Sequence, residues 1–145
     1  MLKVVLDTNA LVSALLCPNG KCGELLRLSA AGAFEIIVSA PLLAELHDVL
    51  HRPRIRKRLG AHPERAAFEY TQAICAAGRM VTDLPEVNLV ADDPNDNHVV
   101  AAALAAGASY LVSGDQDLLT LGVVGGIRCI APAAFLAILR ETGQR

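Results

Sequence analysis

The sequence predicts an α/β fold, a three-layer α/β/α sandwich in which helices cover both faces of a central parallel sheet. Three observations predict it. Short apolar and β-branched runs alternate with amphipathic helical patterns along the whole chain. The 145 residues suit one domain spanning 1–145, and no repeat, linker or low-complexity tract interrupts them. In such sheets, ligands bind beyond the carboxyl ends of the strands.

The elements follow in order from local patterns. Strands are expected where β-branched and apolar residues run together, at 3–7 (KVVLD), 34–39 (FEIIVS), 79–83 (RMVTD), 109–115 (SYLVSGD) and 127–131 (IRCIA). Helices are expected where apolar residues recur at helical spacing between Gly or Pro boundaries, at 9–16, 23–32, 41–52, 62–78, 96–108 and 132–142. A short helical turn is expected at 116–122, a loop at 84–97, and a helix end at Pro53.

Composition excludes several classes of protein. No segment approaches the roughly 18 uninterrupted apolar residues of a membrane-spanning helix. The opening MLKVVLDTN meets an acid too early for a signal peptide, so a cytoplasmic protein without membrane contact is expected. The spacing of the four cysteines matches no zinc site, and the net charge of −2 gives no overall attraction to nucleic acid.

One stretch, HRPRIRKR at 51–58, is strongly basic. Its cations can form a surface for phosphates, or they can belong to a solvated helix end, since no aromatic residues for base stacking are interleaved. Both interpretations stay open. The candidate nucleic-acid-binding residues are Arg52, Arg54, Arg56, Lys57 and Arg58.

Four acids are predicted to share one edge of the sheet. Asp7 and Asp115 follow strands, and Asp96 begins the helix that leads into the strand before Asp115. Glu45 lies in the first turns of the helix after the second strand. Each acid also has a simpler explanation as a helix cap, a turn residue or a surface residue. Capping does not explain why strand ends carry acids repeatedly.

Clustered carboxylates repel one another, and a divalent cation removes that repulsion. Mg²⁺ and Mn²⁺ prefer oxygen ligands and suit phosphoryl chemistry. His98 follows Asp96 closely, but on an apolar helix it is more typical of a partly buried filler than of a ligand. Hydroxyl, amide and acidic residues beside the four acids are candidate supporting groups: Thr8, Asn9, Ser113 and Asp117.

Three segments in order, VVLDTNALVSALL, SAPLLAELHDVL and DDPNDNHVVAAALAAGASYLVSGDQDLL, resemble the PIN-domain nucleases. Within them, the chain resembles the VapC-like toxins of bacterial toxin–antitoxin pairs that carry a DPxDN segment. The resemblance implies Mg²⁺- or Mn²⁺-dependent endoribonuclease activity that leaves a 5′-phosphate and a 3′-hydroxyl. It also implies a homodimer and a cognate antitoxin that covers the acidic cleft. Matched by position, the metal and catalytic residues are Asp7, Glu45, Asp96 and Asp115.

Other functions are weighed beside this one. An aspartyl-phosphate phosphatase needs a second Asp where Asn9 stands. A phosphoacceptor receiver domain needs a lysine near the last strand, and Lys3, Lys21 and Lys57 lie elsewhere. A catalytically silent binding module with the same fold, or a nuclease acting on structured RNA or DNA outside a toxin–antitoxin system, stays open.

Overall fold

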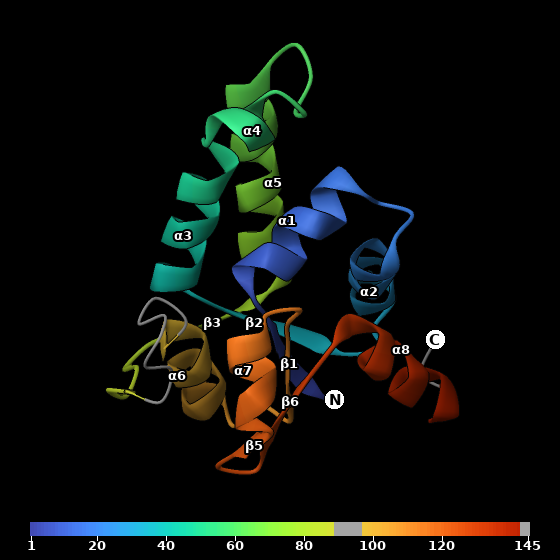
Figure 1. Ribbon diagram of the computed structural model, residues 1–145, viewed down its shortest axis with the longest axis vertical. Coiled ribbons are helices and arrows are strands. Elements are labelled where there is room, and N and C mark those ends of the chain that lie inside the picture. Colours follow the sequence, from blue (N-terminus) through green and yellow to red (C-terminus); the bar gives the residue numbers. More distant parts are fainter. Residues whose placement is uncertain (89–96, 143–145) are drawn as a thin grey trace.

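The computed structural model describes residues 1–88 and 97–142, and a six-stranded sheet forms the centre of this part of the chain (Figure 1). The strand order is β3-β2-β1-β4-β6-β5. The bounds are β1 Lys3–Leu6, β2 Glu35–Ser39, β3 Arg79–Val81, β4 Tyr110–Val112, β5 Val123–Val124 and β6 Ile127–Ile130. Every pairing is parallel except that of β5 with β6. The predicted α/β fold is therefore confirmed, with a mixed, mostly parallel sheet.

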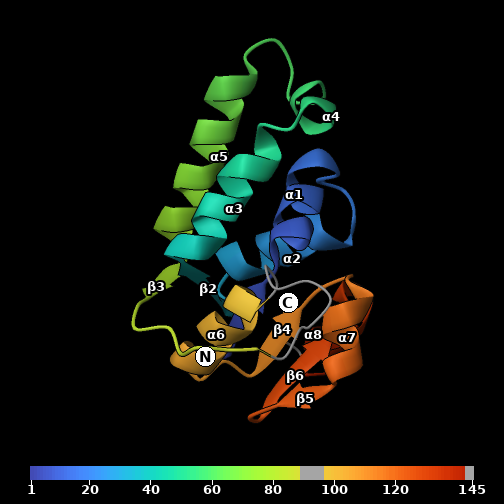
Figure 2. The same cartoon turned by 60° about the vertical axis from the view of Figure 1, so that its left-hand side comes forward.

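Helices flank this sheet, and their bounds are α1 Thr8–Leu16, α2 Lys21–Ala30, α3 Ala40–Leu50, α4 Pro53–Arg56, α5 Pro63–Ala77, α6 Asn97–Ala106, α7 Gln116–Leu121 and α8 Pro132–Glu141. Figures 1 and 2 show α3 and α5 side by side, with α4 at the end away from the sheet. Helix α6 contacts strands β1 to β4, and α2 packs against α8.

Two elements were not predicted. Pro53 ends the helix before it, as expected, but it also begins the one-turn helix α4, because proline fits the first helical position. The two-residue strand β5 pairs with β6 through a turn in which Gly125 and Gly126 have φ of 54° and 83°. Glycine adopts these angles without steric cost. A run of two valines is too short to predict a strand from sequence.

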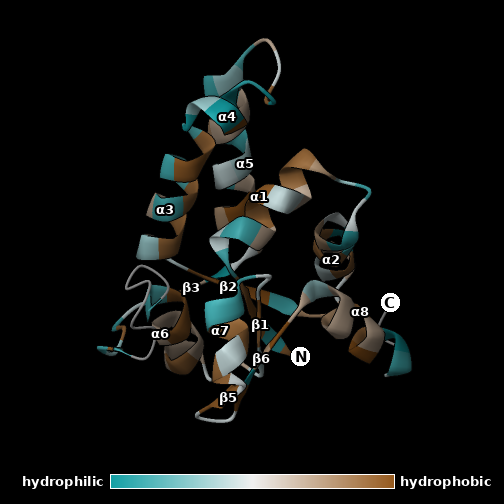
Figure 3. Ribbon diagram, in the orientation of Figure 1, coloured by the Kyte–Doolittle hydropathy of each residue, from teal (hydrophilic) through white to brown (hydrophobic). Residues whose placement is uncertain are grey.

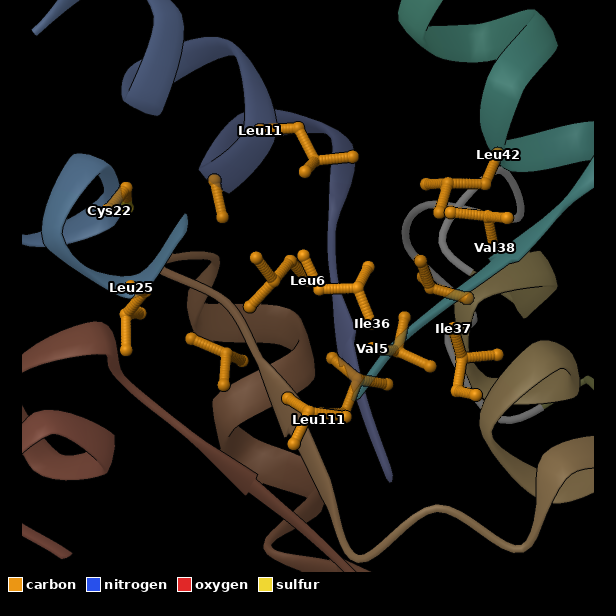
Figure 4. Packing of buried hydrophobic residues seen from close by; sticks show 14 of the residues in the cluster. Val5, Leu6, Leu11, Cys22, Leu25, Ile36, Ile37, Val38, Leu42 and Leu111 are labelled. Atoms are coloured by element: carbon orange, nitrogen blue, oxygen red, sulfur yellow. The ribbon is translucent and has the colours of Figure 1, made fainter. Parts of the chain in front are cut away.

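The core lies between the sheet and its helices. Figure 4 shows side chains from β1, β2 and β4 meeting those of α1, α2 and α3. Phe34 and Phe135 pack edge to face with their ring centroids 5.2 Å apart. Hydropathy follows this arrangement, since α6 is largely hydrophobic and α4 is hydrophilic (Figure 3). Among the described residues, no helix combines the length and apolar character needed to cross a bilayer.

Strand β1 lies between β2 and β4, and Val4, Val5 and Leu6 are fully buried. Leu6 is in register with Val112 of β4. The ladder runs one residue further, because the peptide N–H of Asp7 donates to the carbonyl oxygen of Val112 at 3.1 Å. The register therefore brings the residues after β1 and β4 together at the carboxyl edge of the sheet.

Candidate active site

Among the acids of the predicted set that the structure describes, Asp7 is the most deeply buried, with 4% of its surface exposed. Its Oδ1 accepts the Ala10 N–H at 2.8 Å and so caps α1. Its Oδ2 accepts the Ser113 hydroxyl at 2.5 Å. The N-cap explanation is therefore correct for Asp7, but capping does not use all the hydrogen-bond acceptor positions of the carboxylate. Two hydrogen bonds leave further lone pairs on a group with about four acceptor positions.

Charge at Asp7 is unfavourable in the protein without a cation. Burial raises the pKa of the Asp7 carboxyl, and the nearby carboxylates of Asp115 and Glu45 add to the rise. The hydrogen bonds from Ser113 and from the Ala10 N–H lower this pKa, but they do not cancel the rise. Asp115 and Glu45 therefore each lie within electrostatic reach of Asp7.

Asp115 follows β4 and is tied to Asp7 through one hydroxyl group. The Ser113 side chain is fully buried, and its Oγ accepts the Asp115 N–H at 2.8 Å while its hydroxyl donates to Asp7. The Asp115 carboxylate caps α7 by accepting the Asp117 N–H at 2.9 Å. Ser113 therefore hydrogen-bonds to the Asp7 side chain and to the Asp115 backbone, and its supporting role stays a prediction. Asp117 is half-buried in the first turn of α7.

Glu45 reaches the site from α3, and two side chains hold it. The Thr8 hydroxyl donates to its Oε1, and Nε2 of His98 lies 3.2 Å from the same oxygen. Thr8 is buried at the start of α1, whereas the Glu45 side chain is 29% exposed. Helices α1, α3 and α6 therefore meet at Glu45. Asn9, another of the predicted supporting residues, is exposed, and the hydrogen bonds to Asp7 and Glu45 described above come from other residues.

The donor chemistry fits a divalent cation. In the described part of the chain, no Lys or Arg forms an ion pair with Asp7, Glu45 or Asp115. Carboxylate and hydroxyl oxygens are the donors that Mg²⁺ and Mn²⁺ prefer. Within residues 1–88 and 97–142, no three His, Cys, Asp or Glu side chains are grouped closely enough to hold a metal by themselves. The fourth predicted acid, Asp96, lies outside the described residues, as does most of the DPxDN segment.

The family model for the PIN domain matches residues 3–117, which contain every acid of the predicted set. This chain belongs to the PIN-domain family. PIN domains are generally nucleases, and PIN nucleases generally use divalent metals. The uncharacterized protein MJ1680 of Methanocaldococcus jannaschii is 30% identical to this PIN domain over 120 residues, which cover 83% of this chain and 75% of that protein.

Two solved structures share the fold at low sequence identity. PAE2754 from Pyrobaculum aerophilum has a TM-score of 0.60 at 17% identity, covering 97% of this PIN domain and 90% of that chain. VapBC2 from Rickettsia felis, solved bound to a DNA fragment from their promoter, has a TM-score of 0.58 at 15% identity. That match covers 90% of this chain and 98% of the other.

The PIN domain also carries a groove of about 670 Å³ along α1, the end of α3 and α4. Asn9, two residues from Asp7, lines it, and so do three of the five predicted basic residues. Arg56 instead pairs with Glu64 at 3.3 Å and lines a separate hollow, and Lys57 lines neither. The lining consists of Asn9, Val12, Ser13, Leu16, Cys17, Val49, Arg52, Pro53, Arg54, Ile55 and Arg58.

Sequence reasoning missed two features of this site. Both interpretations of the basic stretch treated its cations as one group, whereas around the one-turn helix α4 they face different neighbours. It also treated His98 as a filler, whereas the ring contacts Glu45. The signal available for His98 was its place in the first turn of a helix that is otherwise apolar.

Proposed function

We propose that this PIN domain is a Mg²⁺- or Mn²⁺-dependent endoribonuclease that hydrolyses phosphodiester bonds in RNA. The observation that carries the proposal is the Asp7 carboxylate, buried beside Asp115 and Glu45 with no cationic partner among the described residues. A protein that buries one carboxylate near two others loses stability, and a bound dication offsets that loss. The residues proposed for the metal and the chemistry are Asp7, Glu45, Asp96 and Asp115.

The chain's own residues orient these acids. Ser113 fixes one oxygen of Asp7 and the backbone of Asp115, so the two acids after β1 and β4 keep a constant separation. Thr8 fixes Glu45. Asp117 stands in the first turn of α7, next to the Asp115 cap, and is proposed as a further acid at the rim. A bound divalent ion would supply Lewis acidity toward the scissile phosphate.

The groove supplies a path for the RNA backbone. Arg52, Arg54 and Arg58 line it together with Asn9, which follows Asp7 by two positions in the sequence. Guanidinium groups bind phosphate oxygens in bidentate geometry. We assign the phosphate contacts to these three arginines, with Arg56 and Lys57 contributing less because they line other parts of the surface.

The likeness in fold to a chain of VapBC2 supports a toxin–antitoxin role. In this proposal the chain is the toxin, a cognate antitoxin covers the acidic site, the toxin forms a homodimer, and the pair acts in the cytoplasm. The acidic site and the groove beside it are the surfaces such an antitoxin would have to block.

The test is cleavage of labelled RNA and of DNA of the same sequence, with Mg²⁺, with Mn²⁺ or with EDTA. Wild type is compared with Asp7→Asn, and Asp48→Asn is the control because Asp48 is an 80% exposed acid on the same helix as Glu45. Wild type and the control are expected to cut RNA only with metal. Asp7→Asn should lose at least about 100-fold in rate, the upper end of the loss seen when a residue that supports a metal ligand is changed.

Equal rates for wild type and Asp7→Asn would overturn the site. Metal binding without cleavage of either polymer would favour a silent binding module, and equal cleavage of DNA would favour a nuclease of broader substrate range. Induced expression supplies the toxin arm, since wild type should arrest bacterial growth and Asp7→Asn should not.

A further inference from the structure

His98 lies where α6 meets the candidate site. It is the second residue of α6, its side chain is 18% exposed, and its Nε2 is 3.2 Å from Oε1 of Glu45. A carboxylate oxygen only accepts hydrogen bonds, so the imidazole must carry its proton on Nε2 to make this contact. The contact therefore selects one tautomer of the His98 ring.

The other ring nitrogen is unmatched. Nδ1 of His98 is buried and has no hydrogen-bond partner among the residues that the structure describes. In the tautomer that serves Glu45, Nδ1 is a bare acceptor. A buried polar atom without a partner lowers stability, so packing alone does not account for histidine at this position.

The residues that follow His98 in α6 are apolar and buried. The sequence of α6 is NHVVAAALAA, and the five residues after His98, Val99 to Ala103, are all buried. Leucine or methionine at position 98 would fill the space without an unmatched nitrogen. What a hydrocarbon side chain cannot supply is the Nε2 donor that reaches Glu45.

Glu45 needs such support. Its long side chain is 29% exposed, and in the described part of the chain the hydrogen bonds that hold it come from Thr8 and His98, both at Oε1. The two donors arrive from α1 and α6, so together they fix the rotation of the carboxylate. Its second oxygen, Oε2, is then the one left to face a ligand.

We propose that His98 is a positioning residue that, together with Thr8, fixes Oε1 of Glu45 so that Oε2 is presented to the metal site beside Asp7. This inference rests on the proposed function. Groups that orient a metal ligand are commonly as necessary as the ligand itself, and their loss costs about 10–100-fold in metal affinity or activity.

The first experiment compares His98→Leu, His98→Gln and His98→Asn. Glutamine carries an amide nitrogen near the place of Nε2, whereas asparagine carries it near the place of Nδ1. Leu and Asn are expected to lower kcat and Mn²⁺ affinity about 10-fold or more, and Gln is expected to restore most of both. The melting temperature of His98→Leu should equal or exceed that of wild type, because the unmatched nitrogen is gone.

Fall of activity together with melting temperature in all three variants would overturn the proposal, and so would full activity in His98→Leu. A background of Glu45→Gln provides the internal control. There, His98→Leu should have little further effect on kcat, because the oxygen that His98 positions belongs to a group already changed.

The second experiment does not depend on nuclease activity. Nitrogen-15 spectra of the labelled imidazoles should show His98 protonated at Nε2. Glu45→Gln should shift these signals, and Asp48→Asn should leave them unchanged. A bare Nε2, or no response to Glu45→Gln, would overturn the positioning role. Failure of the proposed function alone would appear as the expected spectra from a protein that neither binds Mn²⁺ nor cleaves RNA.

Discussion

The Asp7 side and the Glu45 side of the candidate site are held in different ways. Asp7 is 4% exposed, follows the central strand, and is bound by a main-chain N–H and a fully buried serine. The Glu45 side chain is 29% exposed and is bound by two side chains from other helices. The sheet ladder dictates the first position, whereas particular side chains dictate the second.

Because the two sides are held differently, we expect them to tolerate different substitutions. At Asp7 any residue inherits the same backbone position, because the peptide N–H of position 7 continues the ladder to Val112. Only its charge is at issue. At Glu45 the charge is easier to solvate, but its direction depends on Thr8 and His98. We therefore expect charge to govern one side and donor geometry to govern the other.

The largest expected effect is the opposite response of activity and stability to Asp7→Asn. Because the pKa of Asp7 is raised in the folded protein, the folded state keeps this proton at pH values where the unfolded state has lost it. Stability contributed by this group is thus present below about pH 4, the ordinary range for Asp. It falls as pH rises toward the raised pKa, and it stays low above that value.

Asp7→Asn removes this penalty, so in metal-free buffer at neutral pH the variant should melt at a higher temperature than wild type. With Mg²⁺ or Mn²⁺ present, the same variant should cleave RNA at least about 100-fold more slowly. Thermal unfolding at a series of pH values measures the difference, which should shrink toward pH 4. Asp48→Asn, on an exposed surface, should show no such gap. If Asp7→Asn were less stable than wild type at neutral pH, the expected destabilisation by the buried Asp7 charge would be wrong.

The next effect compares the supporting hydroxyls. Ser113→Ala removes a donor to Asp7 and leaves the Asp115 N–H without its acceptor, which should cost about 1–2 kcal/mol of unfolding free energy. It should also raise the pKa of Asp7 further, since the Ser113 bond lowers that pKa. Thr8→Val keeps the side-chain shape and removes only the donor to Glu45, so it should cost less stability than Ser113→Ala.

Both variants should lower the cleavage rate about 10-fold or more, since each removes a group that orients a proposed metal ligand. Urea unfolding and single-turnover cleavage measure the two effects. If Thr8→Val destabilises the protein more than Ser113→Ala does, the contrast between the two sides is wrong.

The smallest effect concerns the basic residues. Arg52→Gln with Arg58→Gln removes two cations that line the groove, and Arg56→Gln is the matched control because Arg56 pairs with Glu64. For the double variant, the slope of log binding constant against log salt should fall by about 1 per lost phosphate contact. The Arg56→Gln control should change this slope less than the double variant does. Equal slopes in all three proteins would indicate that the basic stretch is a solvated helix end that does not bind phosphates.

The sequence predicted the fold class well, because alternation of strands and helices leaves few topologies. It also predicted that residues after β1 and β4 would meet, since parallel strands end at one edge. The hydrogen bond between Ser113 and Asp7 bears out that placement.

What could not be predicted depends on contacts between helices. The orientation of α4, which separates Arg56 from its neighbours in the groove, is set by packing against α3. The meeting of His98 with Glu45 depends on how α6 lies against α3, across 53 positions of sequence. Single-sequence patterns carry no information about such distances. Asp96 remains a prediction from sequence, because it lies outside the described residues.

The pairing of β1 with β4 has a consequence for biosynthesis. Asp7 precedes its Ser113 partner by 106 positions, so it leaves the ribosome well before that partner does. Domains fold from the N-terminus as they emerge, but a parallel strand pair must wait for its second strand. A nascent chain interrupted before β4 cannot complete the carboxylate site. The contact between Asp7 and Ser113 therefore forms only after β4 has been synthesised, however early β1 appears.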